Sequence, residues 1–213
     1  MRSLSAKMSG TREVPFGNYG VMLLATIIFA IQMTLDPQSR YLNGLVLQGW
    51  SACALLGHMW LHMSVSHIGG NLITLWIFGN KVSTRVGNSA YPLIYVAAGL
   101  GAAVAHILYD GRPVIGASGA IMGVLGVYVV LCFAHFGRLG PWLVLTWFLA
   151  TLCAGTIGGS SAAYMAHIGG FLSGMMLAVL LLIVGAVSCD SVDPGLLRIV
   201  KLSHRERGSG QYI

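Results

Sequence analysis

Residues 113–134 read PVIGASGAIMGVLGVYVVLCFA and contain no charged side chain. A helix needs about 20 apolar residues to cross the hydrocarbon core of a bilayer, so this run is long enough to span one. Five further runs of the same character cover residues 19–35, 63–79, 91–108, 141–157 and 162–187. The sequence therefore predicts an all-α polytopic membrane protein with six transmembrane helices.

The composition of the whole chain agrees with a lipid environment. Of the 213 residues, 56% are hydrophobic and only 8% are charged, and the mean hydropathy is +0.78. Ordinary soluble domains carry roughly 25% charged residues, so this chain lacks the polar side chains that a water-facing surface needs. The four cysteines are widely spaced and form no CxxC pair, which argues against a zinc site or a disulfide framework.

The basic residues lie in the short polar gaps between the apolar runs. With a cytoplasmic N-terminus, every Lys and Arg except Arg40 and Arg112 would face the cytoplasm, as the positive-inside rule requires. We therefore expect a cytoplasmic tail over residues 1–18, a membrane domain over 19–187 and a basic cytoplasmic tail over 188–213. The first run is read as an uncleaved helix and not as a signal peptide. Nucleic acid is not an expected partner, because no aromatic residues are interleaved with the basic ones.

Residues 50–61 form an apolar stretch that is too short to span a bilayer. Trp50 and Trp60 within it suit the headgroup level, where amphipathic rings are enriched. We expect a membrane-associated loop, interfacial or re-entrant, between the first and second helices.

All six acidic residues lie outside the predicted spans. This excludes an intramembrane HExxH zinc site, a pair of membrane aspartates and an acidic ion relay. Hydroxyl, imidazole and amide groups remain as the chemically active side chains at membrane depth.

Ser118 and His167 each lie about five residues into their spans, roughly 8 Å below the outer surface. Both helices are predicted to run from outside to inside, and both carry small residues at helical spacing that permit close approach. These residues are Gly116, Gly119, Gly123 and Gly126 in the fourth span, and Gly170, Gly174 and Ala178 beside His167 in the sixth. A serine and a histidine that meet without an acid suggest a Ser-His dyad, in which the imidazole is a general base toward the hydroxyl.

His67 and Asn71 are four residues apart and share one face of the second predicted helix. With the backbone N–H of Ser118, they are candidate donors to an oxyanion. Each residue alone has a more ordinary explanation, since serines and glycines pack membrane helices and a lone histidine is often a neutral core residue. The functional prediction depends on their joint placement.

Three motifs in this order resemble those of the rhomboid intramembrane serine proteases. They are His58-x3-His62-x4-His67-x3-Asn71 at the second span, Gly116-Ala117-Ser118-Gly119 in the fourth, and Ala166-His167-x2-Gly170-x3-Gly174 in the last. The resemblance covers roughly residues 19–187 and extends to the six-span layout and the long first external loop.

The resemblance implies a role for each motif residue. Ser118 would be the nucleophile, His167 the base, His67 and Asn71 the oxyanion donors, and His58 and His62 would help to fix the external loop. Substrates would be single-span or polytopic membrane proteins, cut in or next to a transmembrane segment, with no metal or other cofactor. The expected location is the bacterial inner (plasma) membrane, with both termini cytoplasmic and the site opening to the outer face.

The chain departs from the family pattern at two places. A Trp-Arg pair common in the first loop is replaced by Cys53 and Ala54, and an aromatic residue often found four positions after the serine is Met122. The resemblance also implies substrate entry beside the fifth helix, around Trp147 and Phe148.

Two alternatives to a protease remain at this point. One is a catalytically inactive rhomboid-like protein that binds membrane clients. The other is a metal-binding transporter that uses His58, His62 and His67, although it would lack carboxylate ligands.

Overall fold

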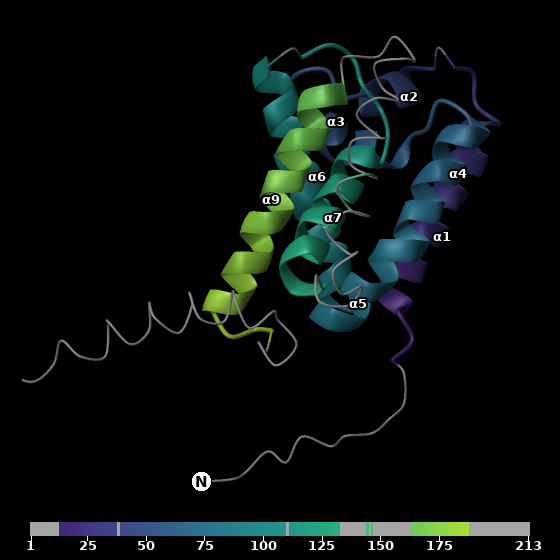
Figure 1. Ribbon diagram of the computed structural model, residues 1–213. Coiled ribbons are helices and arrows are strands. Elements are labelled where there is room, and N and C mark those ends of the chain that lie inside the picture. The colour runs from purple at the N-terminus through teal and green to yellow at the C-terminus, as the bar shows by residue number, and fades with distance from the viewer. Residues whose placement is uncertain are drawn as a thin grey trace, which may run out of the picture.

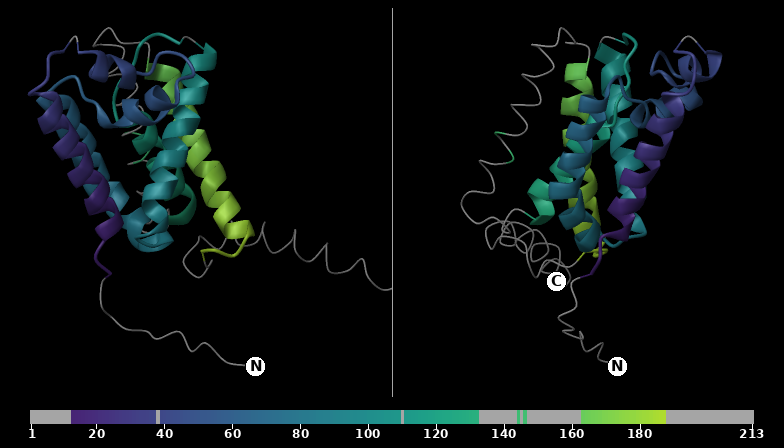
Figure 2. Two further views of the ribbon diagram at one scale, coloured as in Figure 1. Left: turned by 180° about the vertical axis from the view of Figure 1, so that it is seen from behind. Right: turned by 90° about the vertical axis from the view of Figure 1, so that its right-hand side faces the viewer.

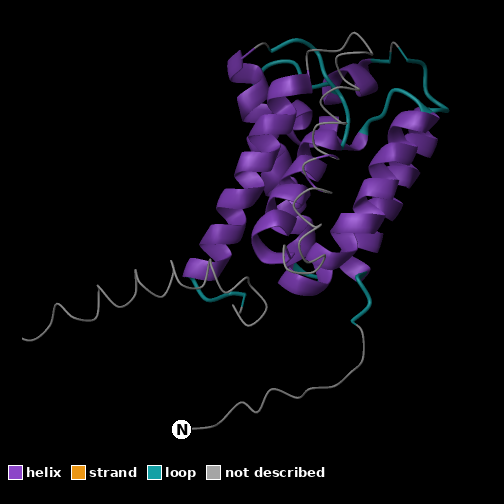
Figure 3. Cartoon of the chain, viewed as in Figure 1, coloured by secondary structure: helices purple, strands orange, loops and turns teal. Residues whose placement is uncertain are grey.

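The structure, a computed structural model, describes residues 13–37, 39–109, 111–132, 144, 146 and 163–187, and these residues are helical apart from their connections (Figures 1 and 3). One isolated bridge pairs Leu47 with Val114, and the described residues hold no other extended pairing. The predicted all-α class is confirmed for this part of the chain. The elements are α1 (Phe16–Gln32), α2 (Arg40–Leu45), α3 (Ala52–Gly57), the 3₁₀ turn η1 (His58–Trp60), α4 (Val65–Thr74), the π-helical turn η2 (Leu75–Gly79), α5 (Asn80–Val86), α6 (Ala90–Tyr109), α7 (Ser118–Cys132) and α9 (Tyr164–Ile183).

The long helices form two neighbouring groups (Figures 1 and 2). Helices α6, α7 and α9 pack against one another, while α1 lies beside the continuous rod formed by α4, η2 and α5. The short helices α2 and α3 cover one end of the molecule, and α1 begins and α9 ends at the opposite end. The loop region between α1 and α4 is thereby placed over the ends of the helices that carry the predicted site residues.

Two of the described helices, α6 and α9, are long and apolar enough to cross a membrane, and α1 and α7 are shorter apolar helices. The predicted third segment, 91–108, is the single helix α6, which extends one residue further at each end. The predicted sixth segment, 162–187, contains the single helix α9, which begins two residues later and ends four residues earlier than expected. The fifth predicted segment, 141–157, lies outside the described residues except at positions 144 and 146, as do Trp147 and Phe148.

The second predicted segment differs from the expected helix over 63–79. It begins at Val65 because the Ser64 hydroxyl caps it by accepting from the His67 N–H at 3.1 Å, and it continues through η2 to Val86. The π turn is joined to its neighbours by the buried Asn18 side chain, which donates to the Leu75 carbonyl at 2.8 Å. The Tyr91 hydroxyl donates in turn to Asn18 Oδ1 at 2.7 Å. These bonds fix the rotation of α4 relative to α1 and α6.

The fourth predicted segment also starts later than expected. Residues 113–117 are not helical, and α7 begins at Ser118, so Ser118 lies at the helix N-terminus and not about one turn inside it. Three features keep this segment out of the helix: Pro113 has no N–H, Val114 pairs with the distant Leu47, and Gly116 has a φ of +135°, which no helix allows.

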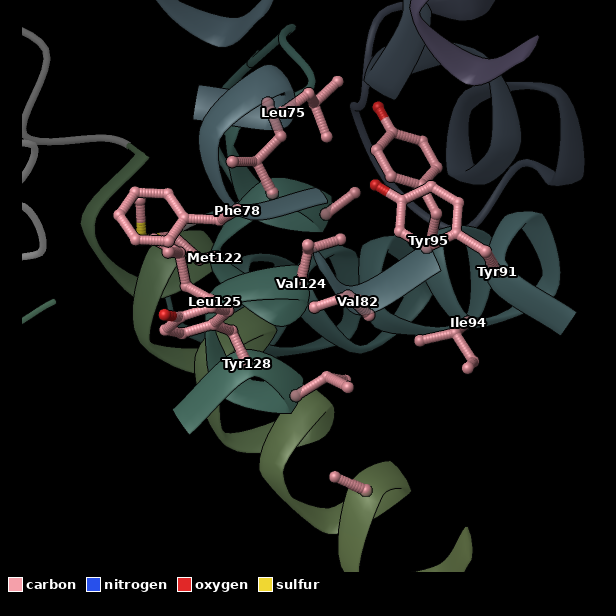
Figure 4. Packing of buried hydrophobic residues seen from close by; sticks show 14 of the residues in the cluster. Leu75, Phe78, Val82, Tyr91, Ile94, Tyr95, Met122, Val124, Leu125 and Tyr128 are labelled. Carbon is pink, nitrogen blue, oxygen red and sulfur yellow. The ribbon is translucent and has the colours of Figure 1, made fainter. Parts of the chain in front are cut away.

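The largest buried hydrophobic cluster in the described part of the chain includes residues of η2, α6 and α7 (Figure 4). Tyr91, Tyr95 and Tyr128 are fully buried, and the Phe78 and Tyr128 rings meet edge to face at 5.2 Å. Edge-to-face aromatic pairs add about 1 kcal/mol beyond the area that they bury. This packing joins η2, which continues α4 beyond His67, to α7, which carries Ser118.

Candidate active site

Ser118 is positioned by the extended segment that precedes α7. Val114 exchanges backbone hydrogen bonds with Leu47 at 3.0 and 3.2 Å, and the Gly116 N–H donates to the His58 carbonyl at 2.9 Å. Gly116 then turns the chain with its positive φ, so that Ser118 becomes the first residue of α7. The N–H groups of a first helical turn have no partner within the helix, so donors are available beside the Ser118 hydroxyl.

His167 lies in the first turn of α9 and contacts Ser118. Its Nε2 atom is 2.8 Å from the Ser118 Oγ atom, and its side chain is only 6% exposed. Helices α7 and α9 approach closely because glycines face each other: a β-carbon on Gly170 would overlap the Gly119 carbonyl, and one on Gly174 would lie 2.6 Å from the Gly123 carbonyl carbon. The small residues therefore bring the hydroxyl and the imidazole into hydrogen-bonding distance.

His67 borders the same place from α4. A β-carbon on Gly116 would lie 3.0 Å from His67 Nε2 and 3.8 Å from Ser118 Oγ, so both side chains flank this glycine. The Met63 N–H donates to His67 Nδ1 at 3.5 Å, which leaves the proton of a neutral ring on Nε2. The ring thus presents an N–H on the side of Gly116 and Ser118.

Asn71 lies one turn further along α4, on the face that carries His67. Its side chain is 9% exposed, and its buried Nδ2 has no hydrogen-bond partner within the described residues. A buried amide without a partner costs free energy, about 1–3 kcal/mol. This group is therefore a donor available to an additional acceptor.

His58 and His62 belong to the loop over the site and make backbone contacts. His58 Nδ1 donates to the Ala54 carbonyl at 3.0 Å, and His62 Nδ1 donates to the Trp60 carbonyl at 3.2 Å. Burial lowers the pKa of both rings. For His62 the pKa falls to about 4, with burial the largest cause and His67 a second. Both rings are therefore neutral and bind the loop to its own backbone.

The metal-transporter alternative finds no support in this geometry. Across the described part of the chain, no group of three or more His, Cys, Asp or Glu side chains is arranged to hold a metal ion. His58, His62 and His67 each point a ring nitrogen at a backbone group instead.

Two residues with extensive contacts were missed by the sequence analysis. Asn18 joins α1 to the π turn, and Gln32 joins the end of α1 to His62 through two hydrogen bonds. The available signal was an amide side chain at each end of an otherwise apolar segment, where a polar group needs a partner.

Comparisons with known proteins agree with these motifs. The sequence model of the Rhomboid domain family matches residues 48–184. The chain is 31% identical over 144 residues to "Rhomboid protease GluP" of Bacillus subtilis, covering 65% of this chain and 28% of that protein. It is 29% identical over 142 residues to "Rhomboid protein 1, mitochondrial" of Saccharomyces cerevisiae, covering 59% of this chain and 41% of that protein. It is also 29% identical over 126 residues to "Rhomboid-type serine protease 2" of Emericella nidulans, covering 57% of this chain and 25% of that protein.

The aligned region thus spans less than half the length of each of these three curated relatives. The family match itself covers more than half of this chain and includes Ser118, His167 and all four residues of the histidine and asparagine motif. The chain therefore belongs to the rhomboid family, as its motifs predicted.

Proposed function

We propose that the chain is an intramembrane serine endopeptidase that uses Ser118 and His167 as a catalytic dyad. The observation that carries the proposal is the 2.8 Å contact between Ser118 Oγ and His167 Nε2. A hydroxyl is a weak nucleophile unless a neighbouring base accepts its proton, and this contact has the geometry for that transfer. Membership of a family that includes named serine proteases supports the same assignment.

In the proposed reaction, His167 Nε2 accepts the Ser118 proton while Oγ bonds to the carbonyl carbon of the scissile peptide. The carbonyl oxygen becomes an oxyanion, which accepts hydrogen bonds from His67 Nε2, Asn71 Nδ2 and the backbone at the start of α7. The imidazolium then donates its proton to the leaving amine as the carbon–nitrogen bond breaks. Water hydrolyses the resulting ester, with His167 acting again as base.

The proposed donors are suited to this role by their surroundings. His67 offers its Nε2–H because its Nδ1 accepts from the Met63 N–H. Asn71 Nδ2 is buried and has no hydrogen-bond partner among the described residues. Removing one oxyanion donor in a serine protease costs about 10² to 10³ in rate, so these two groups are worth several kcal/mol together.

We extend the proposal to the membrane arrangement expected from the sequence: six transmembrane helices, a membrane-associated first loop, and cytoplasmic segments over 1–18 and 188–213 around the domain over 19–187. Exposed apolar side chains support contact with lipid. They include Leu23, Ile27 and Ile31 on α1 and Leu172, Met176, Leu180 and Ile183 on α9. We place the site toward the outer face of a bacterial plasma membrane.

Membrane-anchored proteins are the proposed substrates. In a transmembrane helix each backbone carbonyl accepts a hydrogen bond, so the cleaved segment must enter the site in an extended form. We propose no metal or other cofactor, since the hydroxyl, the imidazole and the donors suffice for acyl transfer.

The test combines covalent labelling with cleavage. Purified protein in detergent is treated with a fluorophosphonate, and the protein in liposomes is given single-span reporter substrates. We expect labelling and cleavage by the wild type, and at least a 10³-fold loss in Ser118→Ala and in His167→Ala. Ser173→Ala is the matched control, because it removes an α9 hydroxyl that packs against Gly101.

The inactive-binder alternative makes the opposite prediction. A folded wild type that takes up no label and leaves the reporters intact, while retaining them on co-purification, would favour a rhomboid-like protein that binds clients without cutting them.

A further inference from the structure

Gln32, the last residue of α1, makes two hydrogen bonds to the backbone of His62. Its Nε2 donates to the His62 carbonyl at 2.7 Å, and the His62 N–H donates to its Oε1 at 3.0 Å. A side-chain amide that makes both bonds to one residue copies the pairing of two β-strands. The end of α1 is thereby joined to the loop just before α4, thirty residues later.

The His62 carbonyl belongs to the same peptide group as the Met63 N–H. That N–H donates to His67 Nδ1 at 3.5 Å. Because a trans peptide is planar, with its C=O and N–H pointing in opposite directions, fixing the carbonyl also fixes the direction of the N–H. A hydrogen bond to the carbonyl further polarises the group and strengthens the bond that its N–H donates.

The neighbouring side chains keep this peptide in place. The His62 ring is 1% exposed, packs edge to face on Phe29 at 6.1 Å, and lies 5.2 Å from the His67 ring. Phe29 is on α1, one turn before Gln32. The last turn of α1 therefore holds both the backbone and the side chain of His62 against His67.

The contacts form one continuous path from α1 to Ser118. Gln32 holds the His62–Met63 peptide, this peptide points its N–H at His67 Nδ1, and His67 Nε2 faces Gly116 beside the Ser118 hydroxyl. A neutral imidazole whose Nδ1 accepts a hydrogen bond carries its proton on Nε2. The Nε2–H is the donor that an oxyanion at Ser118 requires.

We propose that Gln32 is a positioning residue for the reaction: it orients the His62–Met63 peptide, which holds His67 in the Nε2–H tautomer aimed at the oxyanion. The inference rests on the proposed function, since it assigns Gln32 a part in that same site. Gln32 itself touches no reacting atom.

Two measurements on the full chain test the proposal. The first is ¹⁵N NMR of the histidine rings in nanodiscs, with the His67 signals assigned by their loss in His67→Gln. The wild type should show a lone-pair signal for Nδ1 and an N–H signal for Nε2. In Gln32→Met, which keeps the length of the side chain but loses both hydrogen bonds, the two His67 nitrogens should move toward averaged values.

The second measurement is steady-state cleavage of a reporter in liposomes. We expect Gln32→Met to lower kcat about tenfold with little change in KM, because an oxyanion donor acts in the transition state. Thr34→Val is the matched control. It removes a hydroxyl at the same end of α1 whose partner among the described residues is the Ile31 carbonyl, at 2.7 Å, and it should leave kcat and the His67 signals unchanged.

Gln32→Glu provides a second variant in case Gln32→Met does not fold. Its carboxylate accepts from the His62 N–H but cannot donate to the His62 carbonyl, whereas the protonated acid can do both. The kcat of this variant relative to wild type should therefore fall as the pH rises. Loss of thermal stability without a change in this ratio would assign Gln32 a structural role only and overturn the proposal.

The outcomes separate this inference from the proposed function. Unchanged His67 signals and full kcat in folded Gln32→Met overturn the positioning role while cleavage by the wild type stands. If the wild type does not cleave, the proposed function fails, and the His67 signals still decide whether Gln32 sets the tautomer of that ring.

Discussion

The contact between α7 and α9 makes Gly170→Ala the sharpest test of the site geometry. Gly170 lies one turn after His167, and it faces Gly119, the neighbour of Ser118. A β-carbon on Gly170 would overlap the Gly119 carbonyl oxygen and lie 2.9 Å from its carbon. Both partners are backbone atoms of helices, so no side-chain rotation can relieve the overlap, and the helices must separate.

The size of the effect follows from these contacts. Non-bonded heavy atoms reach their optimum near 3.5–4.0 Å, so α9 must move away from α7 by about 1 Å. The bond between Ser118 Oγ and His167 Nε2, now 2.8 Å, would then approach 4 Å, beyond hydrogen-bonding range. A misplacement of about 1 Å costs on the order of 10² in rate, so we expect kcat to fall about 100-fold.

Reporter cleavage in liposomes and the rate of fluorophosphonate labelling measure this loss. Gly20→Ala on α1 is the matched control, since a β-carbon there meets nothing within 4 Å. It should leave both rates unchanged and favour the helix by about 0.5–1 kcal/mol. A folded Gly170→Ala protein that cleaves and labels at the wild-type rate would refute the reasoning from α7–α9 contact.

Three other predictions concern buried polar groups around the site. Burial, with His67 as neighbour, lowers the pKa of His62 from 6.5 to about 4. The folded loop therefore binds the neutral ring, and its free energy of unfolding should fall by up to about 3 kcal/mol as the pH falls from 6.5 to 4. The protection factors of the amides over residues 58–63, which allow for the slower intrinsic exchange at lower pH, should fall in this range in wild type and not in His62→Asn. Asn18→Leu leaves the Leu75 carbonyl and Tyr91 hydroxyl without their buried partner and should cost about 2–4 kcal/mol in thermal unfolding, and a cost below 1 kcal/mol would contradict this. Ser64→Ala removes the α4 cap and should cost about 1 kcal/mol, and Ser64→Asp should restore it.

Much of the candidate site was predictable because each of its residues is a polar side chain within an apolar segment. Polar side chains within long apolar runs are costly in a membrane, so Ser118, His167, His67 and Asn71 stood out against their surroundings. Glycines at helical spacing indicated that the helices bearing Ser118 and His167 approach closely, and these glycines do face one another at that contact.

The exact start of α7 was not predictable from the apolar run. Hydropathy continues from Pro113 through Ala117, but the chain there is extended because Val114 pairs with Leu47, more than sixty residues earlier, and Gly116 bonds to His58. The prediction that Ser118 lies inside its helix was therefore wrong, because hydropathy does not report which backbone groups find partners elsewhere.

The amino-acid sequence by itself determined the helical class, the apolar segments and the candidate site residues, because these depend on composition and on spacing along one helix. Only the tertiary structure decided that the α1 terminus holds the peptide before α4, that Asn18 joins α1 to the π turn, and that Ser118 begins its helix. Each of these rests on hydrogen bonds between residues far apart in the chain. The spacing of residues along one segment carries no information about such partners.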